Sequence, residues 1–133
     1  MTQTFVIAET FPVNPEILFT AWMDSDEHGA FIDSNAEIDP EINGKFTIWD
    51  GYIHGTNLEL IPYSRIVQSW RTTDFPDGAP DSVLELTFEP KGTGTHLTLR
   101  HSKIPEGQAD EYLKGWKEFY FKPMKDYFSE FDH

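Results

Sequence analysis

The sequence predicts an α+β domain in which a curved antiparallel sheet is covered by two short helices and one long C-terminal helix packed across it. Three observations predict this class. Apolar residues recur at helical spacing over residues 17–22, with a period of two from Ala36 to His101, and again at helical spacing after Pro105. An antiparallel sheet with one polar face must bury its apolar face against another layer, and the last helix supplies that layer.

The first elements are a strand and two short helices. Residues 4–9 alternate loosely and are rich in Phe, Val and Ile, which predicts a strand. Asn14 is a favourable helix N-cap and Pro15 suits the first helical position, so a helix is expected to begin there. Asp24 or Ser25 can cap a second short helix that runs toward Phe31.

A six-stranded meander is expected next. Its strands are predicted at residues 36–42, 45–50, 52–61, 65–72, 82–89 and 95–101. Asn43-Gly44 and Asp50-Gly51 are typical hairpin turns. Residues 74–80 contain two prolines and a glycine, and we expect them to form a loop that serves as a mobile lip.

The long final helix carries a broad aromatic stripe with a period of 3.6. The stripe comprises Tyr112, Leu113, Trp116, Phe119, Tyr120, Met124, Tyr127, Phe128 and Phe131. Pro123 lies inside this pattern and predicts a kink. A helix of about 25 residues is roughly 37 Å long, so it can cross the whole sheet. The space between helix and sheet is where a ligand is expected.

Composition excludes several classes of function. The 133 residues include no cysteine, which excludes disulfides, thiol catalysis and thiolate zinc sites. The net charge of −13 argues against nucleic acid and against anionic membranes as partners. Nine acidic residues precede the first basic one, Lys45, and they form either a solvated face or a docking surface for a basic partner. Without a signal peptide pattern or an apolar run of membrane length, a cytoplasmic location is expected.

Residues on the inward faces of the last strands and helix are the candidates for ligand binding. They are Gln68, Trp70, Leu86, Leu99, His101, Trp116, Phe119 and Tyr120. For His101 the alternatives are a hydrogen-bonded core histidine and a polar contact to a ligand. A buried Gln68 is satisfied either by a neighbouring side chain or water, or by the ligand. Trp70 and Trp116 are either core aromatics or a ligand wall.

No catalytic residue, metal or cofactor is predicted. The five histidines are His28, His54, His96, His101 and His133, and none is spaced from another as metal ligands on a helix would be. The serines lack an evident partner base and carboxylate, and no phosphate-binding glycine loop is present.

Four segments carry a resemblance to a known superfamily. They are residues 11–22, residues 43–46, residues 55–70 with Gly55 and Trp70, and residues 94–101 together with Gly115-Trp116. In their order and spacing they resemble the START-like (SRPBCC) superfamily, which implies a helix-grip (START/Bet v-like) fold. The chain is most similar to the domain family named after the activator of heat-shock protein 90 ATPase. The resemblance covers residues 1–133 as a single START-like domain.

Two departures from the family pattern are visible. The full eukaryotic activator carries a further N-terminal domain that this sequence lacks, and the usual double glycine is Asn43-Gly44 here, which also suits a left-handed turn.

The resemblance implies a stand-alone domain that binds a small hydrophobic or aromatic molecule between sheet and helix. Its alternative is a chaperone cofactor of the stress response that docks on an Hsp90-type ATPase. A cyclase- or hydrolase-type enzyme is the minority alternative, because a fold does not by itself imply an activity. The oligomeric state is left open.

Overall fold

The computed structural model describes residues 2–129, and its elements follow the predicted order. They are β1 (Thr2–Phe11), α1 (Pro15–Met23), α2 (Ser25–Ile32), β2 (Ala36–Ile38), β3 (Lys45–Ile48), β4 (Ile53–Ile61), β5 (Arg65–Thr72), β6 (Ser82–Lys91), β7 (Gly94–Pro105), α3 (Ala109–Gly115), the π-helical segment η1 (Trp116–Phe121) and α4 (Lys122–Ser129). Phe131 of the predicted stripe and His133 lie outside the described residues.

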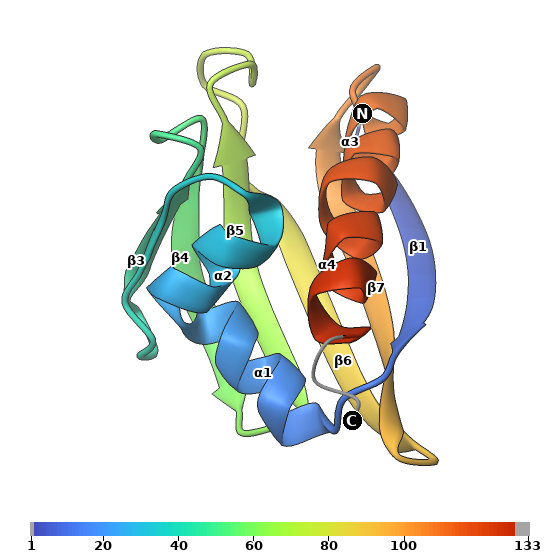
Figure 1. Ribbon diagram of the computed structural model, residues 1–133. Coiled ribbons are helices and arrows are strands. Elements are labelled where there is room, and N and C mark those ends of the chain that lie inside the picture. The colour runs from blue at the N-terminus through green and yellow to red at the C-terminus, as the bar shows by residue number, and fades with distance from the viewer. Residues whose placement is uncertain (1, 130–133) are drawn as a thin grey trace.

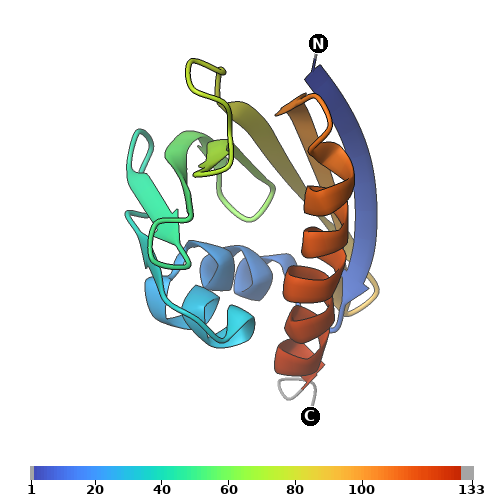
Figure 2. The same ribbon diagram turned by 90° about the horizontal axis from the view of Figure 1, so that it is seen from above.

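All seven strands form one antiparallel sheet in the order β1-β7-β6-β5-β4-β3-β2. Chain neighbours pair throughout the predicted meander, and β1 closes the far edge by pairing with β7. The sheet curves around the C-terminal helices, which lie beside β1, while α1 packs against β6 and β7 and α2 packs against β2 and α4 (Figures 1 and 2). The predicted α+β class and the helix-grip arrangement are confirmed.

Both short helices begin where their capping residues predict. The Asn14 side chain accepts a hydrogen bond from the Ile17 amide at 2.9 Å, and Pro15 occupies the first turn. Asp24 caps α2 by accepting from the Glu27 amide at 3.0 Å. These contacts satisfy amides that have no partner within the first helical turn.

The hairpin expected at Asn43-Gly44 is wider than predicted. Strand β2 ends at Ile38, which pairs with Phe46, and β3 begins at Lys45, so residues 39–44 form a loop instead of a two-residue turn. The buried side chain of Asn57 holds this loop by donating to the carbonyls of Asp39 and Glu41 at 2.7 and 2.9 Å. The loop is therefore held by a side chain of β4, a contact that the local sequence did not indicate.

The C-terminal helix departs from the predicted period before Pro123, not as a simple kink at it. In η1 the Lys122 amide bonds the carbonyl of Lys117, five residues back, and this wider turn rotates the helix face. Phe119, which the α-helical period places inward, is consequently 57 % exposed, whereas Phe121 is buried 5.8 Å from the ring of Phe11.

The inner face of the sheet is the one that alternation predicts. Leu86 and Leu99 are fully buried, and Gln68, Trp70 and His101 lie on the same apolar face. Ion pairs occupy the outer face instead, where Glu85 bridges two arginines, Arg65 and Arg100, at 2.7 and 2.8 Å. None of the helices in residues 2–129 has the length and apolar character needed to span a bilayer.

Candidate functional site

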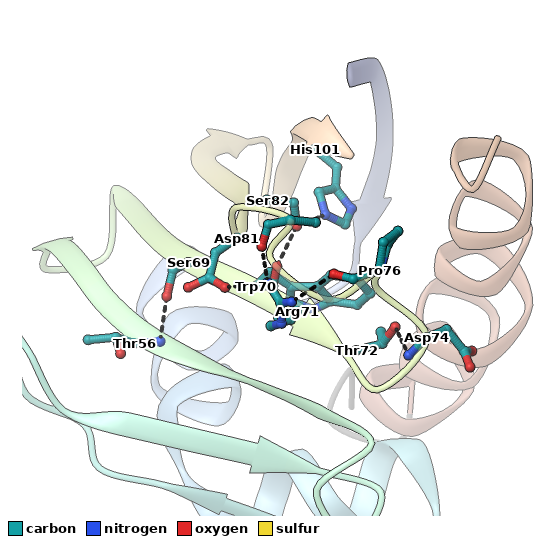
Figure 3. Close-up of polar contacts among 11 residues, drawn as sticks. Thr56, Ser69, Trp70, Arg71, Thr72, Asp74, Pro76, Asp81, Ser82 and His101 are labelled. Carbon is teal, nitrogen blue, oxygen red and sulfur yellow. Dashed lines mark hydrogen bonds and ion pairs between the residues drawn. The ribbon is translucent and has the colours of Figure 1, made fainter. Parts of the chain in front are cut away.

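His101 is the centre of a buried hydrogen-bond chain that joins η1 to the sheet. The indole N–H of Trp116 donates to His101 Nδ1 at 3.1 Å. The proton of the neutral ring must then lie on Nε2, which donates to Ser82 Oγ at 2.8 Å. Ser82 in turn donates to the carbonyl of Trp70 at 2.6 Å, so the serine lies between the histidine and β5 (Figure 3).

The direction of these bonds decides what Ser82 and His101 can do. A histidine activates a serine by accepting its proton, but here His101 donates and the serine proton points to a backbone carbonyl. Burial lowers the pKa of His101 to about 3, which keeps the ring neutral. The pair is therefore a structural link between β5, β6 and the last helix, the first of the two alternatives for His101.

His28 forms a second chain of the same kind. Its Nδ1 donates to the Trp22 carbonyl at 2.8 Å, and Nε2 accepts from the Tyr120 hydroxyl at 2.8 Å. Burial lowers the pKa of His28 to about 4, with the bond to Trp22 acting weakly in the opposite direction, and burial raises the pKa of Tyr120. This chain ties α2 to η1 and satisfies every polar atom of the histidine ring.

Gln68 is satisfied by a neighbouring strand. Its amide nitrogen donates to the side-chain oxygen of Asn57 at 2.9 Å, and both residues are buried. The glutamine therefore supports the residue that holds the 39–44 loop, as the first alternative for Gln68 predicted.

Between sheet and helix the interior is filled by aromatic rings. The ring of Trp116 lies 4.6–6.2 Å, centroid to centroid, from the rings of Trp22, Trp70 and Tyr120. The cavity left beside them, which Gln68 and Tyr120 help to line, measures about 10 Å³. That is room for one water at most. The large internal cavity expected from the fold is thus closed in this chain.

An open pocket lies instead where the β3–β4 turn faces the first half of the C-terminal helix. Its volume is about 140 Å³. It is lined by Trp49, Tyr52, Ile53, Trp70, Glu111, Tyr112, Gly115, Trp116, Phe119 and Tyr120, seven of which are aromatic. The turn residues Trp49 and Asp50 have positive φ values of 53° and 56°, which suits the predicted Asp50-Gly51 turn and brings Trp49 to 5.7 Å from the Tyr120 ring.

Half of the predicted ligand-binding residues line this pocket. Trp70, Trp116, Phe119 and Tyr120 do, whereas Gln68, Leu86, Leu99 and His101 lie behind them in the core. The sequence did not predict the lining residues of the β3–β4 turn, or those of α3 around Glu111. The available signal was the pair of aromatic residues, Trp49 and Tyr52, that flanks the Asp50-Gly51 turn.

Hydroxyl groups form a polar rim beside the aromatic lining. The Tyr52 hydroxyl donates to Asp74 at 2.6 Å, and Tyr112 donates to Gln108 at 2.6 Å while bonding Thr72 at 2.8 Å. Burial is the main reason that the pKa of each tyrosine is raised. These bonds connect the β3–β4 turn, the start of the β5–β6 loop and α3.

The β5–β6 loop is anchored on both of its sides. Arg71 donates to the carbonyls of Pro76 and Ala79 and pairs with Asp81 at 3.3 Å (Figure 3). Phe75 is buried between Trp70 and Tyr112. The loop predicted as a lip is therefore held in place by these contacts, behind the residues that line the pocket. Over residues 2–129 no group of three or more His, Asp or Glu side chains is placed to hold a metal ion.

Comparisons with known proteins place these observations in a family. Residues 12–129 match the family described as "Activator of Hsp90 ATPase homolog 1-like protein". The "Activator of 90 kDa heat shock protein ATPase homolog 1" of Homo sapiens is 30 % identical over 127 residues, which are 96 % of this chain and 37 % of that protein. The corresponding homologue of Dictyostelium discoideum is 30 % identical over 129 residues, 96 % of this chain and 33 % of its own.

A solved structure agrees with the sequence relatives. The crystal structure of PFC0360w, titled an HSP90 activator from Plasmodium falciparum, superposes with a TM-score of 0.87 at 27 % identity. The match covers 92 % of this chain and 94 % of that one. By contrast, this chain spans about a third of the length of the curated relatives.

Proposed function

The chain belongs to the family of Activator of Hsp90 ATPase homolog 1-like proteins, and we propose that it is a binding module whose open pocket receives a small apolar or aromatic group. One observation carries this proposal. The aromatic residues that close the interior also leave an open pocket of about 140 Å³, walled by seven aromatic side chains, at the mouth of the fold.

The size of the pocket limits the ligand. Pockets for drug-sized molecules measure about 300–1,000 Å³, whereas an apolar cavity of about 150 Å³ is enough for benzene. The occupant is therefore a single ring or a compact group, either alone or as the buried end of a longer molecule that extends into solvent.

Gly115 offers a direct test because it lines the pocket and lies in a helix. A Cβ atom there would meet only Phe119 Cδ2, at the ordinary contact distance of 3.9 Å. Gly115→Leu is expected to fill the pocket, while Gly115→Ala keeps most of the volume and serves as the matched control. The readout is isothermal titration calorimetry with phenol and indole, because both ligands absorb where tryptophan is excited and indole emits where it emits.

We expect saturable binding to the wild type and to Gly115→Ala, with affinity reduced at least tenfold in Gly115→Leu. Binding that is equal in all three proteins would place the ligand elsewhere. The absence of saturable binding to the wild type would refute the proposal.

Docking on an Hsp90-type ATPase is the second candidate, and the names of the relatives favour it. The acidic N-terminal third supplies a surface for a basic partner, and Glu37 and Glu41 are exposed on it. We expect the purified Hsp90-type ATPase of the same organism to bind at low ionic strength, where screening is weakest. The double variant Glu37→Gln, Glu41→Gln should bind more weakly than the matched control Asp77→Asn, Glu89→Gln. No binding by the wild type at low salt would exclude this candidate.

A further inference from the structure

We propose that the open pocket recognises a small methylated ammonium cation, such as the head group of choline. This inference rests on the proposed function, because it names the chemical class of the group that the pocket takes up.

The rings surround the pocket on several sides. Trp49 stands nearly perpendicular to both Phe119 and Tyr120, with interplanar angles of 81° and 83°. On the opposite side Trp70 and Tyr112 meet at 78°. In the contacts that the described residues make, the lining rings form no stacked pair, so the pocket lacks a parallel slot that would favour a flat ligand over a rounded one. Steeply inclined rings instead enclose a compact, rounded group.

The charge around the pocket favours a cation. Of the ten lining residues, Glu111 is the only one that carries a charge at neutral pH, and none is Lys, Arg or His. The carboxylate of Asp74 stands behind Tyr52, 2.6 Å from its hydroxyl. The whole chain adds a net charge of −13. Aromatic faces attract cations within about 6 Å of the ring centroid, and the attraction grows when the cation is desolvated.

Volume and hydration select the methylated form. The pocket of about 140 Å³ is close in size to an apolar cavity of about 150 Å³ that binds benzene, and tetramethylammonium, with five non-hydrogen atoms, is of similar size to benzene with six. A primary ammonium keeps its hydration shell through strong hydrogen bonds, which aromatic walls cannot replace. A methylated ammonium has apolar surface and weak hydration, so it loses little on entering an aromatic pocket.

The test compares choline with its neutral isostere, 3,3-dimethylbutan-1-ol, which has the same shape without the charge. Titrations are followed by tryptophan fluorescence and by the proton NMR shift of the ligand methyl groups. We expect choline to bind at least fivefold more tightly than the isostere, with its methyl signal shifted upfield by the surrounding rings. Gly115→Leu should abolish both effects.

One matched pair of variants isolates the charge, and a third variant tests the ring faces. Glu111→Gln should weaken choline binding at least threefold, whereas Glu118→Gln, which removes the same charge from the same helix outside the pocket, should leave it unchanged. Phe119→Leu keeps an apolar wall on an exposed position, so it should weaken choline and spare the isostere.

Each outcome separates this inference from the proposed function. Equal or tighter binding of the isostere overturns the cation site and leaves a pocket for neutral groups. If neither ligand binds, the cation site is overturned, and the phenol and indole titrations then decide the proposed function on their own.

Discussion

Lowering the pH from 7 to 5 is expected to destabilise the fold through two buried histidines. His28 and His101 are neutral in the folded protein, with pKa values lowered to about 4 and about 3 from an ordinary value of 6.5. At these two sites the unfolded chain therefore binds more protons than the folded one between the folded pKa values of about 3–4 and the unfolded value of about 6.5. By linkage, the free energy of unfolding falls as the pH falls through this range.

The magnitude follows from the distance between pH 5 and the unfolded pKa. That distance is about 1.5 pH units, and each unit corresponds to about 1.4 kcal/mol, so each histidine costs about 2 kcal/mol at pH 5. His28 and His101 together cost about 4 kcal/mol, a large share of the 5–15 kcal/mol that is typical of a domain. Acidification toward the isoelectric point of about 4.5 also relieves repulsion among the acidic residues, which opposes this loss.

Glutamine variants separate the two effects. In His28→Gln the amide can still donate to the Trp22 carbonyl and accept from Tyr120, and in His101→Gln it can accept from Trp116 and donate to Ser82. The glutamine side chain in each variant does not titrate, and both variants keep the surface charges of the wild type. Urea unfolding followed by tryptophan fluorescence at pH 7 and pH 5 should show that the wild type loses about 2 kcal/mol more than each single variant.

The reasoning is refuted if wild type and double variant lose the same stability between pH 7 and 5. A second measurement checks the ring protons directly. Long-range ¹H–¹⁵N spectra should show the proton on Nδ1 of His28 and on Nε2 of His101, because the carbonyl of Trp22 and the indole of Trp116 fix these tautomers.

Three further substitutions test the packing by urea unfolding at pH 7. Asn57→Ala strands two loop carbonyls and the Gln68 amide, and should cost about 3 kcal/mol; a loss below about 1 kcal/mol would mean that the loop is held by something else. Ser82→Ala leaves the Nε2–H of His101 without an acceptor and should cost about 1–3 kcal/mol, and an unchanged midpoint would contradict the hydrogen-bond directions given above. Gly55→Ala would place a Cβ atom 1.8 Å from the Ser69 carbonyl, so it should prevent folding, and a soluble variant of wild-type stability would show that β4 and β5 are less closely apposed.

Much of the fold could be predicted because its determinants are local or periodic. Asn14 and Asp24 cap helices through contacts three residues away, and alternation correctly assigns Trp70 and His101 to the inner face of the sheet. A strand residue can face only one of two ways, so a few apolar neighbours are enough to decide it.

The rest depended on contacts that no local pattern contains. In the sequence Asn57 is an ordinary polar residue of a strand, yet it is fully buried and holds a loop. Only the pairing of the strands brings that loop beside it. The proton on His101 is fixed by Trp116, fifteen residues away. The sequence did not predict the pocket wall that the β3–β4 turn forms, because turn residues have no periodicity that shows where their side chains point.

The π-helical segment supplies residues to both the closed interior and the open pocket. Trp116 and Tyr120 point inward from its wider turn, as the helical period predicts, and one donates to His101 and the other to His28. The same turn directs Phe119 outward, opposite Trp49. A regular α-helix would place Phe119 on the inward face, as the sequence period predicts. The residues that deny a ligand the interior are thus the ones that build a site for it at the surface, which is why a small, compact group is the ligand to test first.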